Sequence, residues 1–167
     1  MAIHPVFVHF HTGILAALAA VALVNIILRI FFRDNINTPG TRLSRVFHQF
    51  DVFIYIGSMI GFLGLIAGMV TGFMEPEFPV DALVQMPIMR FKILWSVVSV
   101  EIYLYLILVR TKLGDRVWLK ASTYFPYAIL VIFGGVLMII IGALGGIAVY
   151  DTSILQPILD WIGIPWP

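Results

Sequence analysis

The sequence predicts an all-α integral membrane four-helix bundle with both termini on the outer side of the membrane. The 167-residue chain is 61% hydrophobic and 11% charged, whereas soluble domains carry about 25% charged residues. Four apolar runs are each long enough to cross a bilayer, which takes about 20 residues. Because lipid cannot satisfy backbone polar groups, each run is expected to form a helix.

In chain order, the predicted spans are residues 5–31, 48–73, 88–109 and 124–150. Between them lie short connections with the Asn, Pro and Gly residues that end helices. Residues 151–167 form an apolar, aromatic tail that is too short to span. We expect this tail to lie in the membrane interface, where tryptophan side chains act as anchors.

The basic residues predict the orientation of the bundle. Eight of the ten flank the first and third connections, namely Arg29, Arg33, Arg42, Arg45, Arg110, Lys112, Arg116 and Lys120. Arg90 and Lys92 are the other two. The positive-inside rule therefore places connections 32–47 and 110–123 in the cytoplasm of a cell-membrane protein, with both termini outside.

Stripes of small residues predict where the helices pack. The second span carries such a stripe on one face, at Gly57, Gly61, Gly64, Gly68 and Gly72, and the fourth span carries one at Gly135, Gly142 and Gly146. The first span has a stripe at Gly13, Ala16 and Ala20, and His9 shares its face. Small residues let two helices approach closely. We therefore expect His9 to point into the bundle.

The opposite face of the first span is polar at both ends. It carries His4 and His11 at one end and Asn25 and Arg29 at the other. Polar residues inside membrane spans are costly unless they meet a partner. We expect this face to contact another subunit or a cofactor; the alternative is that these side chains only reach the two membrane interfaces.

The histidines are the candidate cofactor ligands, because imidazole is the commonest metal ligand in proteins. A haem b held within one chain needs two axial ligands at one depth on different helices, and His48 lies near the other surface. The remaining candidate is His9 with Met74 or Met89, while His4 and His11 could serve a haem shared with another chain.

A copper or zinc site could draw on imidazoles and outer carboxylates, from His4, His9, Glu75, Glu77 and Asp151.

Two further positions predict proton or partner contacts. Glu101 lies near the middle of the third span, where a charge is costly. We expect it to be protonated and bonded to Ser58, Ser99 or a tyrosine, or paired with another subunit, and a proton relay or quinone site stays open.

His48 and Asp51 lie one turn apart at the inner end of the second span. They could form a proton entry point, or Arg45 or Arg29 could pair with Asp51.

Three segments resemble an uncharacterised family of four-helix bacterial and archaeal membrane proteins. Residues 4–10 read His-Pro-Val-Phe-Val-His-Phe, and residues 145–150 read Gly-Gly-Ile-Ala-Val-Tyr. The end of the second span also matches, at Gly64, Gly68, Thr71, Gly72 and Glu75. The family usually has proline where this chain has His11, and several members have a histidine in the third helix that this chain lacks. The resemblance implies a four-helix fold and an association with membrane redox proteins.

Together these observations predict an accessory, non-catalytic membrane subunit of a larger redox or respiratory complex. Such a subunit would contact lipid and other membrane subunits in a hetero-oligomer. The chain contains no nucleophile or phosphate-loop motif, so we do not expect an enzyme that acts alone. It also lacks a basic cluster with interleaved aromatic residues, so we expect no nucleic-acid partner. The alternative is an electron-transfer subunit in which His9 binds haem or a metal.

Overall fold

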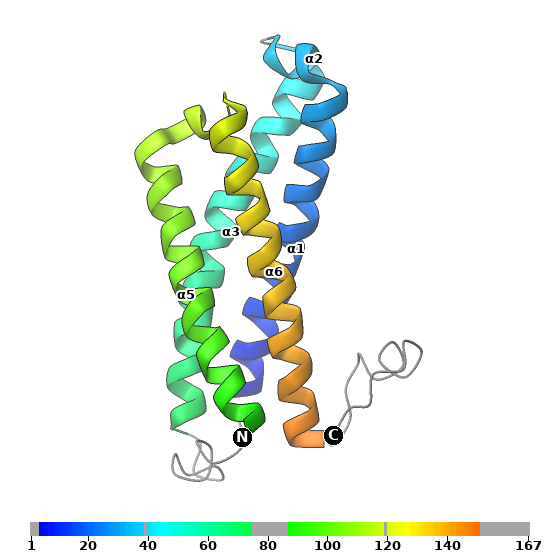
Figure 1. The fold of residues 1–167 in the computed structure, drawn as a ribbon. Coiled ribbons are helices and arrows are strands. Elements are labelled where there is room, and N and C mark those ends of the chain that lie inside the picture. The colour runs from blue at the N-terminus through cyan, green and yellow to red at the C-terminus, as the bar shows by residue number, and fades with distance from the viewer. Residues whose placement is uncertain (1–3, 39, 75–86, 119, 151–167) are drawn as a thin grey trace.

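The computed structural model describes residues 4–38, 40–74, 87–118 and 120–150 (Figure 1). These residues form four long helices, α1 (His4–Phe31), α3 (Arg42–Phe73), α5 (Pro87–Leu113) and α6 (Ala121–Tyr150). Two short elements follow α1 and α5, namely α2 (Arg33–Asn37) and the 3-10 helix η1 (Gly114–Trp118). Each long helix contains a segment long and apolar enough to cross a membrane. The predicted all-α four-helix membrane bundle is confirmed.

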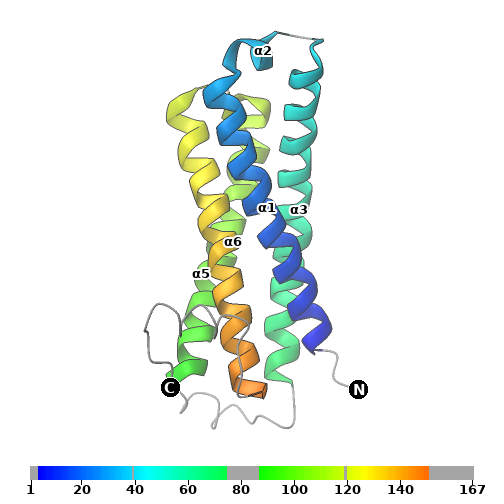
Figure 2. The same ribbon diagram turned by 90° about the vertical axis from the view of Figure 1, so that its right-hand side faces the viewer.

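The four helices form two layers with neighbours running in opposite directions. α1 packs on α3 and α6, and α5 packs on the same two helices, so α1 and α5 lie at opposite corners. Figure 2 shows α1 lying across α3 and α6. α6 is the most buried of the four spans and α5 the least. The α5 helix therefore has the largest share of its side chains facing away from the bundle.

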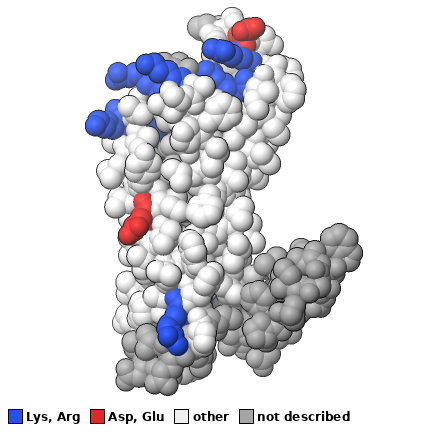
Figure 3. Space-filling model, in the orientation of Figure 1, with Lys and Arg blue, Asp and Glu red and all other residues white. Residues whose placement is uncertain are grey.

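One end of the bundle carries most of the basic side chains. α2, η1 and the two connections that they belong to lie together at this end (Figure 1), and Figure 3 shows Lys and Arg gathered there. We call it the basic end. The Thr41 hydroxyl accepts a bond from the amide of Ser44 at 3.1 Å, and it donates to the carbonyl of Asn35 at 2.7 Å. This residue thus caps α3 and holds α2 against the start of that helix.

The glycine stripe of α3 is a packing surface, as predicted. A Cβ atom built at Gly57 would lie 2.6 Å from a methyl carbon of Leu18, and one at Gly61 would overlap a methyl carbon of Leu15. Gly135 of α6 is as tightly placed, because a Cβ there would lie 2.6 Å from the carbonyl oxygen of Leu15. The backbone of α6 thus approaches α1 as closely as glycine permits at Gly135, while the glycines of α3 leave room for the leucine side chains of α1.

The prediction for the two faces of α1 is wrong. His9, Gly13 and Ala20 are exposed, whereas His11 is buried with 3% of its surface accessible. The buried face continues through residues that include Leu15, Leu18, Ala22, Asn25 and Arg29. The physical reason is that α3 and α6 supply the small residues. The matching side of α1 therefore brings side chains such as Leu15 and Leu18 to fill the grooves, while Gly13, Ala17 and Ala20 face outward.

Candidate functional site

A buried ion pair near the basic end ties α3, α5 and η1 together. Asp51 of α3 is 2% exposed and accepts two bonds from the Arg110 guanidinium, from Nε at 3.0 Å and from Nη2 at 2.5 Å. The indole N–H of Trp118 also donates to Asp51. Arg110 Nη2 makes a further bond to Asp115 at 2.7 Å. Every donor of this set comes from α5 or η1 and converges on one carboxylate of α3.

The chain reaches this geometry through a turn at Gly114. Its φ of 57° lies in the left-handed region, which glycine adopts without the steric cost that a side chain adds. The turn starts η1 directly after α5, so that Asp115 and Trp118 return toward Arg110. The Trp118 ring then packs edge-on against Phe47 and Tyr127, with ring centroids 5.5 and 5.4 Å away. Aromatic packing from α3 and α6 thus holds in place the indole N–H group of Trp118 that donates to Asp51.

Arg29 forms a second polar contact at the same end. Its guanidinium donates to the side-chain oxygen of Asn37 at 2.9 Å and lies 5.9 Å from the ring centre of Tyr124. Only 8% of the Arg29 surface is exposed. The buried arginine therefore links α1 to α2 by a hydrogen bond and to α6 by a cation–π contact.

A cleft of about 400 Å³ opens between these two contacts. Its polar lining includes Arg29, Asn37, His48, Asp51 and Asp115. Side chains of both charge signs and an imidazole therefore meet in one recess. We take this recess as the candidate functional site of the part of the chain that the structure describes.

Three side chains of the cleft could hold a metal ion by geometry alone. One ligand atom each from His48, Asp51 and Asp115 lies within 4.8 Å of the others. However, Arg110 Nη2 already bonds to both carboxylates, at 2.5 Å to Asp51 and 2.7 Å to Asp115. The guanidinium supplies the positive charge that a metal would bring, and a cation beside it would be repelled. The donor set therefore fits its own arginine better than a metal.

Asp51 does not pair as the sequence suggested. The predicted alternatives were His48, one turn away, or Arg45 or Arg29. Among the described residues Asp51 bonds to Arg110 and Trp118, while His48 is exposed at the cleft. The sequence analysis missed Arg110, Trp118 and Asp115. The opposite directions of α3 and α5 were a usable signal, because they bring the start of α3 and the end of α5 to one depth.

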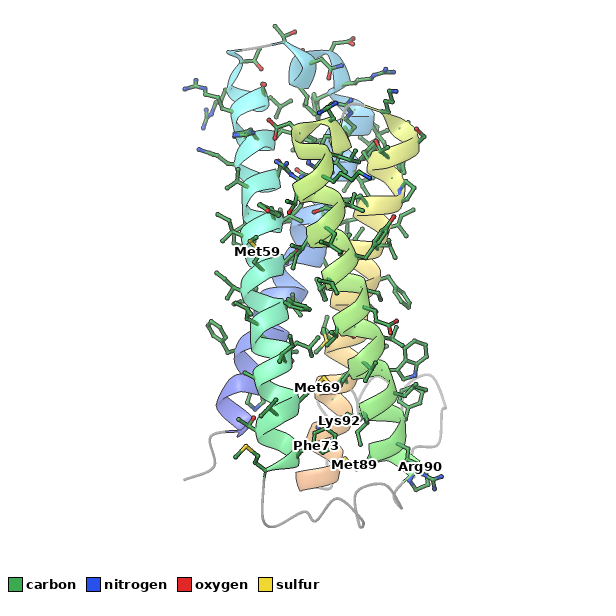
Figure 4. The ribbon with its side chains drawn as sticks, turned by 90° about the vertical axis from the view of Figure 1, so that its left-hand side faces the viewer. Met59, Met69, Phe73, Met89, Arg90 and Lys92 are labelled. Carbon is green, nitrogen blue, oxygen red and sulfur yellow. The ribbon has the colours of Figure 1, made fainter. Side chains whose placement is uncertain are left out.

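The described haem-ligand candidates His9, Met74 and Met89 lie on α1, at the end of α3 and on α5. His9 is exposed on α1, and Met89 is 9% exposed on α5, at the opposite corner of the bundle. Figure 4 shows Met89 and Lys92 at the same end as Met69 and Phe73 of α3. Met74 is 74% exposed. Glu75, Glu77, Asp151 and the side chain of His4 lie outside the part that the structure describes.

Of the two predicted alternatives for Glu101, a bond within its own bundle is not found among the described residues, and pairing with another subunit stays a prediction. Its side chain is exposed on α5, and no described residue forms a hydrogen bond or ion pair with it. Ser99, one of the predicted partners, donates to the carbonyl of Trp95 at 2.8 Å. Ser58 is fully buried. The sequence identified an unusual residue, but it could not show that the side chain faces outward.

Comparison with known proteins adds no homologue, because no family model, no curated protein and no solved structure matches the chain.

Proposed function

We propose that this chain is an accessory, non-catalytic integral membrane subunit of a larger membrane-bound redox complex, in which it positions a catalytic subunit. The observation that carries the proposal is the exposed side chain of Glu101. This residue lies nine positions from both Lys92 and Arg110 on the same helix, or about 13 Å along the axis from each. Arg90 and Lys112, the other two basic residues of α5, lie further away still, so no basic side chain of this helix is at the depth of Glu101.

An exposed carboxyl group in the middle of a span is unfavourable in lipid. A charged residue at the centre of a membrane helix costs about 2.5–3.5 kcal/mol on insertion scales. The Lys and Arg residues of α1 and α3 lie near the basic end and α6 has none, so a second copy of this chain in the same orientation offers no such cation at that depth. A helix of a different subunit that brings a hydrogen-bond donor or a cation removes this cost.

The surface around Glu101 suits such a partner helix. Exposed apolar side chains follow each other at helical spacing along this face of α5, namely Phe91, Leu94, Val97, Leu104 and Leu108. Glu101 lies in the middle of this row. Figure 3 shows acidic atoms midway along a face that otherwise carries no charge between its ends. A partner would thus find one polar anchor within an apolar contact.

The outward face of α1 supports the proposal independently. A Cβ built at Gly13 would have nothing within 4 Å, so no described residue of the bundle requires this glycine. Glycine in a helix is less favourable than alanine by about 1 kcal/mol. A second membrane helix that approaches α1 closely gives the exposed small residues Gly13, Ala17 and Ala20 a packing role.

Replacement of Glu101 tests the proposed role. In native membranes, we expect Glu101→Leu to release the chain from its complex, measured as a loss of the high-mass species on native gels. A photo-crosslinker at Leu104, one turn away, should form an adduct with the partner that Glu101→Leu abolishes. The matched control places the crosslinker at Leu63 of α3, which is 65% exposed and should give no such adduct.

Glu101→Gln separates a hydrogen bond from an ion pair. It should keep the complex if the partner offers a hydrogen-bond donor, and lose it if the partner offers a cation. A Glu101→Leu protein that remains in the complex at the wild-type level would refute the proposed contact.

The exposed imidazole of His9 favours a second candidate function. The side chain is accessible on α1, where it could provide one axial ligand of a haem whose second ligand comes from another subunit. An absorption spectrum of the purified complex distinguishes the two functions. Loss of a Soret band in His9→Ala would support the haem-ligand function, and a Soret band that His9→Ala leaves intact would exclude it.

A further inference from the structure

Seven buried side-chain atoms lack a hydrogen-bond partner among the described residues. They are the Thr12 hydroxyl, both amide atoms of Asn25, the Ser58 hydroxyl and the hydroxyls of Tyr103, Tyr124 and Tyr127. A buried polar group without a partner costs about 1–3 kcal/mol. Lipid offers no hydrogen bonds in return. A water molecule inside the bundle can donate hydrogen bonds to the unpartnered oxygen atoms and accept hydrogen bonds from the unpartnered N–H and O–H groups.

Most of these atoms lie at related depths in the half of the bundle toward the basic end. Leu18 of α1 contacts Gly57 of α3. Seven residues nearer the basic end, Asn25 of α1 is therefore level with Phe50 of α3, the neighbour of Asp51. The contact of Arg29 with Tyr124 likewise places Asn25 level with Ala128, next to Tyr127. Three side chains without partners, Asn25, Tyr124 and Tyr127, therefore lie near the depth of the Asp51–Arg110 ion pair.

Ser58 and Tyr103 lie deeper along the same axis. Asp51 of α3 pairs with Arg110 of α5. Ser58 and Tyr103 each lie seven residues along these helices from that pair, which is about 10 Å further from the basic end. Both are fully buried. The Tyr103 hydroxyl lies 2.9 Å from a Cβ built at Gly134, so the absence of a side chain at this position makes room for it.

Apolar side chains close the interior beyond this level. Leu15, Leu65 and Met138 are each at most 2% exposed. The contacts of Leu15 with Gly61 and Gly135 place it level with the Tyr103 hydroxyl at Gly134, and Leu65 and Met138 follow one turn further from the basic end on α3 and α6. At the other end, the cleft lined by Asp51 and Trp118 is open. Except for the Thr12 hydroxyl beyond this layer, the unpartnered atoms thus run from an open recess to a closed apolar layer.

We propose that this half of the bundle binds a chain of water molecules that enters from the cleft and ends at Tyr103. Hydroxyl and amide groups both donate and accept hydrogen bonds, so they can hold successive waters in place. The chain gives protons from the basic end access to the middle of the membrane. This role goes beyond the proposed subunit function, and it holds whether or not Glu101 binds a partner.

Single cysteines can test the water chain, because the protein has no cysteine of its own. Ser58→Cys is nearly isosteric and lies inside the bundle. Its neighbour Met59 is 37% exposed to the surroundings of the bundle (Figure 4), so Met59→Cys is a control at the same depth. In sealed vesicles, the thiols are exposed to Ag⁺ on one side only, and the thiols left free are then counted by alkylation. We expect Ser58→Cys to react at least about tenfold faster than Met59→Cys, since the thiolate that binds the ion forms in water.

A second pair of variants and a sidedness reference complete the experiment. Ala128 is fully buried and Ile129 is 56% exposed, so Ala128→Cys should also react faster than Ile129→Cys. Arg116→Cys marks the basic end, and Ser58→Cys must react from that same side. Equal rates in both pairs would overturn the proposal. Reaction of Ser58→Cys from the opposite side, or equally from both sides, would overturn the closed end at Tyr103.

Discussion

The contact between α1 and α6 at Gly135 yields the sharpest stability prediction. Replacement by alanine places a Cβ 2.5 Å from the Cβ of Ala19 and 2.6 Å from the carbonyl oxygen of Leu15. Carbon atoms at rest lie about 3.5–4 Å apart, so α1 and α6 must separate locally by about 1 Å. Neither neighbour can rotate away, since one is backbone and the other is the first atom of a side chain. Overpacking of this kind costs about 1–3 kcal/mol.

The assay is reversible unfolding of purified protein in mixed micelles with increasing denaturing detergent, followed by circular dichroism. Gly135→Ala should lower the free energy of unfolding by that amount. Gly13→Ala is the matched control, because its Cβ meets nothing within 4 Å and alanine favours helix by about 1 kcal/mol over glycine. Should the two variants differ by less than about 0.5 kcal/mol, which is typical of surface changes, the close approach of α1 and α6 would be refuted.

Two further predictions use the same assay. Asp51→Leu should lower the free energy of unfolding by about 3–5 kcal/mol, because it leaves Arg110 buried without its main partner; the double variant with Arg110→Leu should recover most of this loss, and additive losses would contradict the ion pair. Gly68→Ala places a Cβ 2.9 Å from Cε1 of His11, so its cost of about 1–3 kcal/mol should shrink in a His11→Ala background, and an unchanged cost would show that the imidazole lies elsewhere.

Hydropathy predicted the helices well because their lengths follow from the thickness of the membrane. The expected spans 5–31 and 124–150 correspond to α1 (His4–Phe31) and α6 (Ala121–Tyr150). The differences lie at the basic end. There α3 begins at Arg42 and α5 continues to Leu113, because polar side chains are tolerated where a helix leaves the lipid.

The candidate site was only partly predictable. Asp51 and His48 stood out as ionisable residues near a span, but the partner of Asp51 depends on how α5 turns into η1. That turn requires the positive φ of Gly114 and the packing of Trp118 between Phe47 and Tyr127. The order of charged residues in a sequence does not show which of several arginines forms the ion pair with a given carboxylate in the folded protein.

The sequence by itself determined that four helices cross the membrane, that the basic residues gather at one end, and that the glycines of α3 form a contact surface. Only the tertiary structure decided which face of α1 points inward. In water, hydrophobicity separates inside from outside, but lipid is as apolar as leucine, so a membrane helix carries no such signal. The buried face of α1 follows from complementary shape: α3 and α6 provide grooves, and His11, Leu15 and Leu18 fill them.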